Sequence, residues 1–401
     1  MSSVANGRFH IGINAHLLST EDSYRRAGIH QYIAQVLRHL PQDEGMEYTI
    51  FSQYQPPFMQ RPDFAPVASR WPTERRIIRI LWEQIAWPWQ ARQRRLDLLH
   101  SMAFVTPLLS RRPAIVTIYD LSFIHFPDRF PRLQRQYLTA MSRRACHHAR
   151  RIITISESGR QDVHRFFGVP LERIAVVYPG VDSVYKPLPA GDVAAFRREK
   201  GLPDRFLLHV GTLQPRKNIP VLLEAFARVV KSADAERWGG HSTRSVERDG
   251  GLHLLLVGGK GWLFDEIFRR VEELGIQKRV HFTGYVPDSE LPLWYNAAAA
   301  FVFPSVYEGF GMPVVEAMAC GTPVIASNAS SIPEAAGMAA RLFVPQDVEG
   351  LAAAITAVIQ SPPLQQKMRQ QGRRQAASFS WERAGMETAV VYREARGASK
   401  S

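Results

Sequence analysis

The sequence predicts an α/β protein made of two doubly wound domains that face each other across a cleft. Short apolar, β-branched runs alternate along the chain with longer segments of helical period. Such alternation is typical of parallel sheets covered by helices on both faces. The chain has 401 residues, too many for one ordinary core and suited to two domains of about 180–200 residues. Two Rossmann-like domains are therefore expected, with ligands at the carboxyl ends of their strands.

Six strand candidates fall in each half of the chain. They are residues 9–15, 46–52, 96–101, 114–120, 151–156 and 174–180, then 205–211, 252–259, 280–286, 299–305, 322–328 and 340–345. The boundary is placed at Tyr178–Gly180, where proline and glycine end the sixth strand. The predicted domains are residues 1–180 and 181–380, and a helix with Ser380 as its N-cap is expected over 381–401. The polar segment Ser232–Gly251 is predicted to be a surface loop.

The composition is that of an ordinary globular protein, with 45% hydrophobic and 22% charged residues. The two cysteines, Cys146 and Cys320, fit a reduced compartment better than a disulfide framework. The N-terminus lacks a signal-peptide pattern, and no run of about 18 apolar residues is available to span a bilayer. We expect a cytoplasmic protein, either soluble or peripheral on the inner face of the membrane.

The positive charge is concentrated in the first half of the chain. Up to Gly180 there are 24 arginines, no lysines and 14 acidic residues, so this half carries +10 of the total +13. Such a field attracts phosphate groups in nucleic acids, anionic lipids or phosphate-bearing substrates. Charge alone does not choose among these partners.

The segment Pro304–Ser327 has the most specific pattern in the sequence. It follows an apolar strand, and Met312–Cys320 is predicted to be a helix with Pro313 in its first turn. Gly309 and Gly311 allow backbone amides to approach a phosphate at the helix N-terminus. Glu308 and Glu316, eight positions apart, can each accept hydrogen bonds from paired sugar hydroxyls. The alternative for the two carboxylates is a solvated loop residue and a helix-dipole partner.

This segment, EGFGMPVVEAMACGTPVIAS, closely resembles the retaining family 4 glycosyltransferases of the GT-B fold. HVGTLQPRKNIPVLLEAF, VGGKGW, FTGYVPDSEL and VYPGVD match further landmarks of that family, as do AGIHQYI and FSWERAG near the two ends. The resemblance covers essentially the whole chain. It implies that the C-terminal helix crosses back onto the N-terminal domain.

The resemblance also implies roles for individual residues. Arg216 and Lys217 would neutralise the donor diphosphate in place of a metal, which agrees with the lack of a DxD-like carboxylate cluster. Glu316 would bind the ribose, and Glu308 would hold the transferred sugar. The donor site would be completed by Gly28, Gly211, Tyr285, Val286, Gly309, Phe310, Gly311 and Met312, with the backbone of Tyr285 and Val286 reading the base. Gly28 has a second interpretation as a simple turn glycine.

One position departs from the family pattern. Tyr119 and Asp120 stand where the family commonly has His-Asp in the active site. Tyr119 can donate a hydrogen bond but cannot carry a proton at neutral pH. Asp120 either orients the acceptor or is a structural turn residue. The preferred donor, and activity itself, are put in question by this change.

Two basic segments of the first half have no role in this scheme. In Glu74–Arg95, the residues Ile77, Ile78, Leu81 and Ile85 share a helical face, which is predicted to pack into the domain core. The alternative is an interfacial helix on a membrane. Residues Arg132–Arg151 are predicted to be exposed and to approach anionic lipid or a lipid-diphosphate acceptor.

The predicted function is retaining, metal-independent transfer of a hexose to a glycan or lipid-linked acceptor, without a cofactor and with no nucleic acid as partner. GDP-mannose is the first choice of donor and a UDP-hexose the second. A front-face displacement is expected because no second carboxylate is placed as a nucleophile. Two other classes stay open: a GT-B phosphorylase or epimerase, and a nonenzymatic nucleic-acid or membrane binder.

Overall fold

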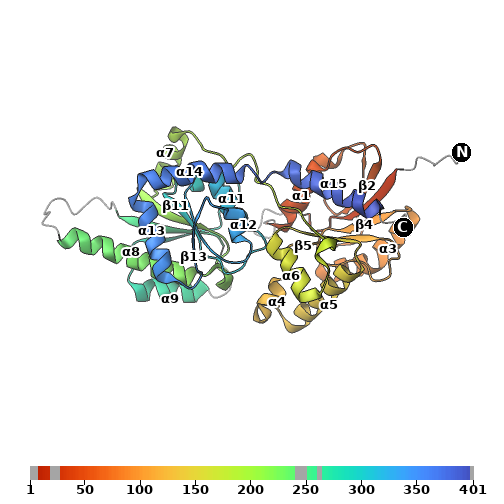
Figure 1. Ribbon diagram of the computed structural model, residues 1–401, viewed down its shortest axis with the longest axis horizontal. Helices are drawn as coiled ribbons and strands as arrows, with labels where there is room; N and C mark the ends of the chain where they lie inside the picture. Colours follow the sequence, from red (N-terminus) through yellow and green to blue (C-terminus); the bar gives the residue numbers. More distant parts are fainter. Residues whose placement is uncertain (1–7, 19–27, 240–250, 260–263, 398–401) are drawn as a thin grey trace. The chain divides into compact units, whose positions relative to one another are not determined.

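Two parallel β-sheets, one of seven strands and one of six, form the cores of the molecule. The computed structural model describes residues 8–18, 28–239, 251–259 and 264–397 (Figure 1). The chain divides into unit 1, residues 1–180 with 380–401, and unit 2, residues 181–379. Each unit holds one sheet with helices packed on it (Figure 1). The predicted fold class is confirmed.

The sheet of unit 1 has the strand order β3-β2-β1-β4-β5-β6-β7, with every neighbouring pair parallel. The strands are β1 (Phe9–Asn14), β2 (Met46–Ser52), β3 (Phe64–Ala68), β4 (Leu98–Ser101), β5 (Ala114–Ile118), β6 (Arg151–Thr154) and β7 (Ile174–Val176). β3 was not among the strands predicted from the sequence. This strand contains Pro66 and lies at the edge of the sheet, where the missing amide proton leaves no ladder bond unmade.

Helices from both ends of the chain pack together in unit 1. The helices are α1 (Ile29–His39), η2 (Pro57–Met59), α2 (Arg76–Leu81), η3 (Trp82–Ala86), α3 (Trp87–Gln93), α4 (Ser122–His125), η4 (Pro127–Arg129), α5 (Arg132–His148), α6 (Glu157–Phe167), η5 (Leu171–Arg173) and α15 (Trp381–Gly397). The C-terminal α15 packs against α1, and its Tyr392 hydroxyl lies 2.8 Å from Nδ1 of His100 in β4. The predicted N-cap is confirmed, because the Arg383 amide donates to Ser380 Oγ over 3.2 Å.

The prediction for the apolar face of Glu74–Arg95 is wrong. Ile77 and Ile85 are 74% and 61% exposed, while Trp82 and Trp87 are buried. Residues 82–86 form a π-helical turn, and Pro88, which has no amide proton to donate within the helix, follows it. The wider turn keeps the two indoles on one side, stacked with ring centroids 5.9 Å apart. Two indoles bury more apolar surface than the aliphatic side chains, so they determine which face is buried.

The sheet of unit 2 has the order β10-β9-β8-β11-β12-β13 and is also fully parallel. Its strands are β8 (Arg205–Val210), β9 (Leu252–Val257), β10 (Val280–Gly284), β11 (Ala300–Phe303), β12 (Val324–Ser327) and β13 (Arg341–Phe343). Its helices are α7 (Ala190–Glu199), η6 (Pro215–Lys217), α8 (Ile219–Gly239), α9 (Phe264–Leu274), α10 (Leu291–Ala297), α11 (Met312–Ala319), α12 (Ile332–Ala336), α13 (Val348–Gln360) and α14 (Pro362–Ala376). The predicted loop at Ser232–Gly251 is corrected in part, because α8 continues through the helix-favouring run of alanine, glutamate and arginine to Gly239. The rest of that loop, residues 240–250, lies outside the described residues.

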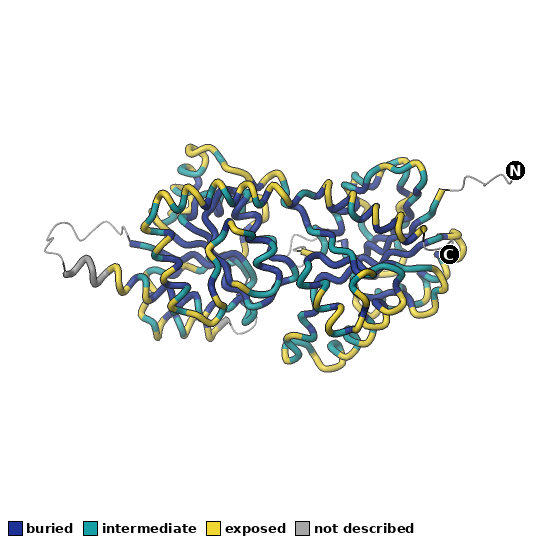
Figure 2. The backbone as a smooth tube through the Cα atoms, viewed as in Figure 1, coloured by how far each residue is buried: buried dark blue, intermediate teal, exposed yellow. Residues whose placement is uncertain are grey.

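The central strands of both sheets are largely buried, whereas the edge strand β3 carries exposed residues (Figure 2). In unit 2, α8 packs against α9 and α13, and α10 packs against α7 and α11. Cys146 and Cys320 are both buried free thiols. Within the described residues, no helix has the length and hydropathy needed to cross a membrane.

Candidate functional site

The point at which strand order reverses in unit 2 lies between β8 and β11. These strands are neighbours in the sheet, although β9 and β10 separate them in the sequence. In doubly wound sheets, ligands bind outside the carboxyl ends of the strands at such a point. Residues 211–218 follow β8 and residues 304–311 follow β11, so two of the predicted donor-binding segments meet here. Their contact is direct, since the Val306 amide donates to the Arg216 carbonyl over 2.8 Å.

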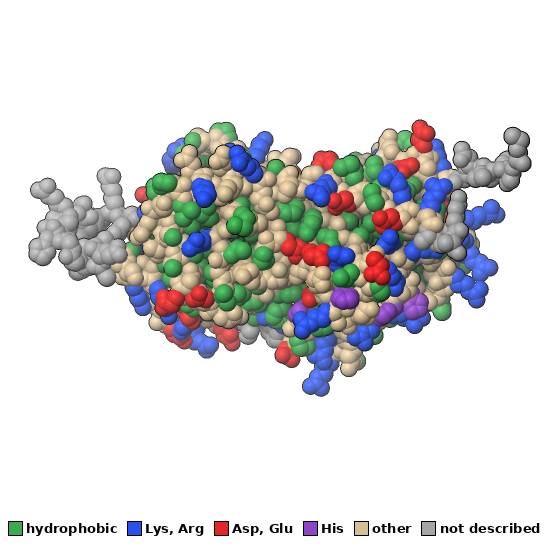
Figure 3. Space-filling model, viewed as in Figure 1, with side chains coloured by type: hydrophobic (Ala, Val, Ile, Leu, Met, Phe, Trp, Pro, Cys, Tyr) green, Lys and Arg blue, Asp and Glu red, His purple; other side chains and the backbone are tan. Residues whose placement is uncertain are grey.

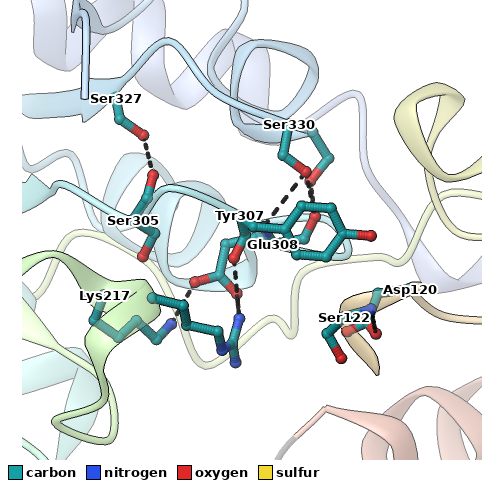
Figure 4. Close-up of polar contacts among 10 residues, drawn as sticks. Asp120, Ser122, Lys217, Ser305, Tyr307, Glu308, Ser327 and Ser330 are labelled. Atoms are coloured by element: carbon teal, nitrogen blue, oxygen red, sulfur yellow. Dashed lines mark hydrogen bonds and ion pairs between the residues drawn. The ribbon is translucent and has the colours of Figure 1, made fainter. Parts of the chain in front are cut away.

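Glu308 is held between two cations (Figure 4). The Nζ of Lys217 donates to Oε1 of Glu308 over 2.6 Å, and a guanidinium nitrogen of Arg216 donates to Oε2 over 2.6 Å. Arg216 also donates to the Tyr307 carbonyl over 3.1 Å. Glu308 and Lys217 are buried, whereas the Arg216 side chain keeps 26% of its surface exposed. The cluster therefore presents positive charge to solvent through Arg216.

The ion pairs decide the charge of Glu308. Burial by itself would raise the pKa of this carboxyl, but attraction to Lys217 and then Arg216 outweighs it and lowers the pKa to about 2. Burial lowers the pKa of Lys217, and the Glu308 carboxylate opposes that shift. With the two groups 2.6 Å apart, both remain charged at neutral pH.

Glycine at position 211 leaves room for the lysine. Gly211 has a φ of 153°, and a Cβ built there would lie 3.1 Å from Cε of Lys217. The ammonium also lies 4.7 Å from the ring centroid of Phe303, within the range of a cation–π contact. The side chain of Lys217 is thus enclosed on several sides and points at Glu308.

The backbone of Glu308 is fixed from a third loop. The hydroxyls of Ser330 and Ser331 each donate to the Glu308 carbonyl over 2.8 Å (Figure 4). Both serines follow β12, next to β11 in the sheet. These serines were not predicted from the sequence, since isolated serines in a loop give no recognisable pattern.

Gly311 is the N-cap of helix α11 and has a φ of 107°, a conformation that favours glycine. Phe310 is buried and packs against Phe379, with ring centroids 5.1 Å apart. Among the described residues no side chain caps the first turn, which starts at Met312. The amides of this turn and the segment from Gly309 are placed where a helix N-terminus attracts negative charge.

Glu316 lies in α11 and is buried in surroundings unlike those of Glu308. The Tyr295 hydroxyl donates to its Oε2 over 2.9 Å. Burial, helped by repulsion from Asp288 and Asp182, raises the pKa of Glu316 to about 7, although the Tyr295 hydrogen bond opposes this. Tyr295 was not predicted from the sequence, because nothing in its helix marks it as a partner of the carboxylate.

Tyr285 and Val286 line a cavity of about 820 Å³ at the side of the sheet. Tyr285 is 48% exposed and Val286 is buried. Thr283, Leu255 and Trp294 line the same cavity. The cavity is not lined by Glu308, Lys217 or Glu316. It is therefore a part of unit 2 next to the end of β10, separate from the residues around Glu308.

The residues predicted in the first half lie in unit 1. Tyr119 is buried, and its hydroxyl donates to the Met102 carbonyl over 2.7 Å, so its one proton is already engaged. Asp120 accepts a hydrogen bond from the Ser122 amide over 2.9 Å (Figure 4), as a turn aspartate does. Gly28 precedes α1 with a φ of 81°, and a Cβ there would touch nothing within 4 Å. The backbone conformation alone is sufficient to explain this glycine.

Metal ligands do not gather in the described part of the chain. No group of three or more His, Cys, Asp or Glu side chains in those residues is arranged to hold an ion. Arginine side chains, drawn in blue in Figure 3, lie on the visible face of unit 1, whose described residues contain no lysine.

Two family models match the chain. The model of the glycosyl transferases group 1 matches residues 192–375. The model of glycosyltransferase family 4 matches residues 26–184. The first match lies within unit 2 and contains the whole Glu308 cluster.

Similar proteins include two that are named as mannosyltransferases. The chain is 32% identical over 306 residues to the O-antigen chain mannosyltransferase B of Escherichia coli, covering 76% of each protein. It is 32% identical over 273 residues to the MMP α-(1→4)-mannosyltransferase of Mycolicibacterium hassiacum, covering 67% of this chain and 60% of that protein.

Solved structures share the fold at lower identity. A sucrose-phosphate synthase from Thermosynechococcus elongatus superposes with a TM-score of 0.72 at 22% identity, covering 98% of this chain and all of that one. The HepE protein of Anabaena, solved in complex with UDP, gives a TM-score of 0.69 at 18% identity, covering 96% and 99% of the two chains. The paired sheets, the two family matches and the similarity to the O-antigen enzyme together show that this chain belongs to the family 4, group 1 glycosyltransferases of the GT-B fold and is a glycosyltransferase.

Proposed function

We propose that this glycosyltransferase transfers mannose from GDP-mannose to a hydroxyl group of a glycan or lipid-linked acceptor. Mannose as the transferred sugar is supported by the names of two proteins similar to this chain, an O-antigen chain mannosyltransferase and an MMP α-(1→4)-mannosyltransferase. A UDP-hexose is the second candidate for the donor. The nucleotide would bind in unit 2, with Glu316 on the ribose and the segment around Tyr285 next to the base.

The contact of Lys217 and Arg216 with Glu308 is the observation on which this proposal rests. A glycosyl transfer from a nucleotide sugar needs positive charge at the leaving diphosphate and a hydrogen-bond acceptor for the sugar hydroxyls. The cluster supplies both within one site. Charge-assisted hydrogen bonds of this kind contribute about 1.5–3 kcal/mol each.

The reaction that we propose retains the anomeric configuration. The acceptor hydroxyl oxygen bonds to the anomeric carbon as the bond to the diphosphate oxygen breaks, on the same face of the sugar. An oxygen of the departing diphosphate takes the hydroxyl proton. Arg216 and Lys217 stabilise the diphosphate and no metal is required, so the protein acts by positioning and charge stabilisation. An α-mannoside product from GDP-α-mannose would support retention, and a β-mannoside found by NMR would contradict it.

A thermal-shift panel tests the donor site. GDP, UDP, ADP, GDP-mannose and UDP-glucose are added to the wild type, to Glu316→Gln and to a control, Glu266→Gln, at an exposed glutamate of α9. A ligand at 100 times its Kd adds about 2.7 kcal/mol of stability. We expect a shift with guanine nucleotides that survives EDTA and is reduced only in Glu316→Gln. A panel without any shift would contradict the proposal, and a shift lost in EDTA would contradict metal independence.

We further propose that unit 1 attaches peripherally to an anionic membrane surface on the cytoplasmic side. Ile77, Leu81, Ile85 and Trp89 are each at least 45% exposed. Exposed arginines stand at both ends of this stretch, at positions 75, 76, 92, 94 and 95. Apolar side chains flanked by arginine suit an interface of anionic lipid head groups.

Vesicle co-sedimentation at low salt tests this attachment. The wild type should bind vesicles containing phosphatidylglycerol and should not bind pure phosphatidylcholine vesicles. Ile85→Ser with Trp89→Ser should weaken that binding without lowering the melting temperature, because both side chains are exposed. Val390→Ser, at an exposed valine of α15 in unit 1, is the control. Equal binding by the double variant would contradict the proposal.

A further inference from the structure

The sheet of unit 1 has its own reversal of strand order, between β1 and β4. β2 and β3 extend the sheet from one side of this pair, and β5, β6 and β7 extend it from the other. The carboxyl ends of the pair carry Asn14 and Ser101, and both side chains are buried. In doubly wound sheets, ligands bind outside the carboxyl ends of the strands where the strand order reverses, so this is where unit 1 would bind a ligand.

The π-helical turn η3 lies over this point. The Asn14 side-chain amide donates to Oε1 of Glu83 over 3.2 Å. The next residue, Gln84, accepts from the Leu108 amide over 2.8 Å and donates to the Thr106 carbonyl over 3.4 Å. The turn thus connects the end of β1 with the segment that follows β4. Single π-turns inside helices are frequent at functional sites.

Asn14 is itself oriented by its neighbours. Its side-chain oxygen accepts from the His16 amide over 3.2 Å. The His16 ring packs edge-on against Trp82 at 4.0 Å and lies 2.9 Å from the Thr73 hydroxyl. Because the amide oxygen of Asn14 is occupied, its amide nitrogen is directed at Glu83. The arrangement fixes the position of the carboxylate.

Glu83 forms no ion pair with the charged and titratable groups around it in the described residues. Among the described residues, no cation lies within 4 Å of the carboxylate, and Oε2 accepts no hydrogen bond. Arg79 of α2 attracts it from farther away, and burial raises the pKa of Glu83 to about 7. His16 stays neutral, since burial and Arg79 lower its pKa to about 3. From α5, the buried Tyr137 hydroxyl has no hydrogen-bond partner among the described residues, and Glu83, Arg76 and Arg79 all act on it.

We propose that Glu83 is an acceptor-binding residue, whose carboxylate accepts a hydrogen bond from a hydroxyl group of the acceptor sugar while Asn14 holds it in place. This rests on the proposed function and assigns the acceptor side of the same reaction. A neutral sugar suits the site, because a carboxylate, an amide and a phenol are the groups that recognise hydroxyls. The ionised form of Glu83 is the stronger acceptor, so acceptor binding improves as the pH rises through about 7.

Three variants test whether Glu83 binds the acceptor or only stabilises the fold. Glu83→Gln keeps the shape and removes the charge, Glu83→Asp keeps the charge, and Glu74→Gln changes an exposed glutamate of the same segment. The acceptor probes are octyl α-mannoside, octyl β-glucoside and octyl α-galactoside, used with saturating GDP-mannose and, in parallel, UDP-glucose. Acceptor KM, kcat, the pH profile of kcat/KM and the thermal shift by GDP and UDP are measured.

In Glu83→Gln we expect the acceptor KM to rise about tenfold to a hundredfold, the size of one hydrogen bond to a charged group. The nucleotide thermal shift should not change, and the rise of kcat/KM through pH 7 should disappear. Glu83→Asp should recover part of the KM, and Glu74→Gln should match the wild type. A Glu83→Gln enzyme with unchanged KM and pH profile would overturn the proposal. So would a wild type that binds nucleotide but neither binds nor glycosylates any of the three glycosides. A wild type that binds no nucleotide would instead overturn the proposed function itself.

Discussion

The Nζ of Lys217 lies 2.6 Å from Oε1 of Glu308, although 91 positions separate the two residues in the chain. They meet because the segments after β8 and β11 emerge side by side from the sheet. The lysine side chain packs against the Phe303 ring and against Gly211, which has no side chain to displace it, and its ammonium contacts the Glu308 carboxylate. A donor diphosphate would therefore encounter a cation whose position is set before the substrate arrives.

Lys217→Ala should slow transfer by at least about 30-fold, because about 2 kcal/mol of stabilisation of the leaving diphosphate is lost. Steady-state kinetics with varied nucleotide sugar measures the change. Lys231→Ala, at an exposed position of α8, is the control and should behave as the wild type. Wild-type kcat/KM in Lys217→Ala would remove this residue from the diphosphate site.

Gly211→Ala should reproduce part of that defect without changing any charge. The new Cβ would lie 3.1 Å from Cε of Lys217 and 3.4 Å from its Nζ, so the end of the lysine side chain must shift by a few tenths of an ångström. We expect weaker nucleotide binding in calorimetry together with a lower melting temperature. Gly191→Ala in α7, where a Cβ meets nothing within 4 Å, should be neutral or slightly stabilising. Identical behaviour of the two alanine variants would contradict this account of position 211.

Glu316 should make the ligand-free protein less stable as the pH rises from about 4.5 to about 7. Its pKa is raised from 4.5 to about 7 by burial. Between these values the unfolded chain releases the proton and the folded chain keeps it, so stability falls with pH. The full difference is on the order of 3 kcal/mol. Glu316→Gln should remove this dependence, so its stability relative to the wild type should increase between pH 4.5 and about 7 and change no further above that. Urea unfolding at pH 5 and pH 8 measures it, and a constant difference between the two proteins would contradict the prediction.

Tyr295→Phe should make nucleotide binding more sensitive to acid. The Tyr295 hydroxyl favours the ionised form of Glu316, to which it donates over 2.9 Å. Without it, the pKa of Glu316 should rise further, and the pH midpoint of GDP or UDP binding should move upward. Calorimetric titrations between pH 6 and about 8.5 measure the midpoint. Tyr54→Phe in unit 1 is the control, and an unmoved midpoint in Tyr295→Phe would count against a ribose role for Glu316.

Gly385→Ala should destabilise unit 1 through the contact of α15 with α1. A Cβ at this position would approach the His39 carbonyl oxygen to 2.1 Å, so the two helices must separate. Overpacking of this kind costs about 1–3 kcal/mol. Thermal unfolding followed by circular dichroism should show the loss, while Met386→Ala at the exposed neighbouring position should not. Equal melting temperatures would show that the helices adjust freely.

Local patterns in the sequence were sufficient to predict the fold class. All twelve predicted strands are present, because apolar runs bounded by glycine and proline are signals that each segment carries alone. β3 was missed because Pro66 argues against a strand unless the position of that strand at the edge is known. In Trp82–Ala86 the regular helical period failed, since a π-turn shifts which side chains share a face.

The sequence by itself determined the two parallel sheets, the family and the segments that carry Lys217, Glu308 and Glu316. It did not determine what each carboxylate does. Glu308 and Glu316 are the same residue type eight positions apart, yet the pKa of the first is lowered to about 2 and that of the second is raised to about 7. The difference comes from residues far away in the chain, two cations for Glu308 and a phenol with acidic neighbours for Glu316. Only the tertiary structure brings those groups together, and electrostatic energy depends on that distance and burial rather than on sequence spacing.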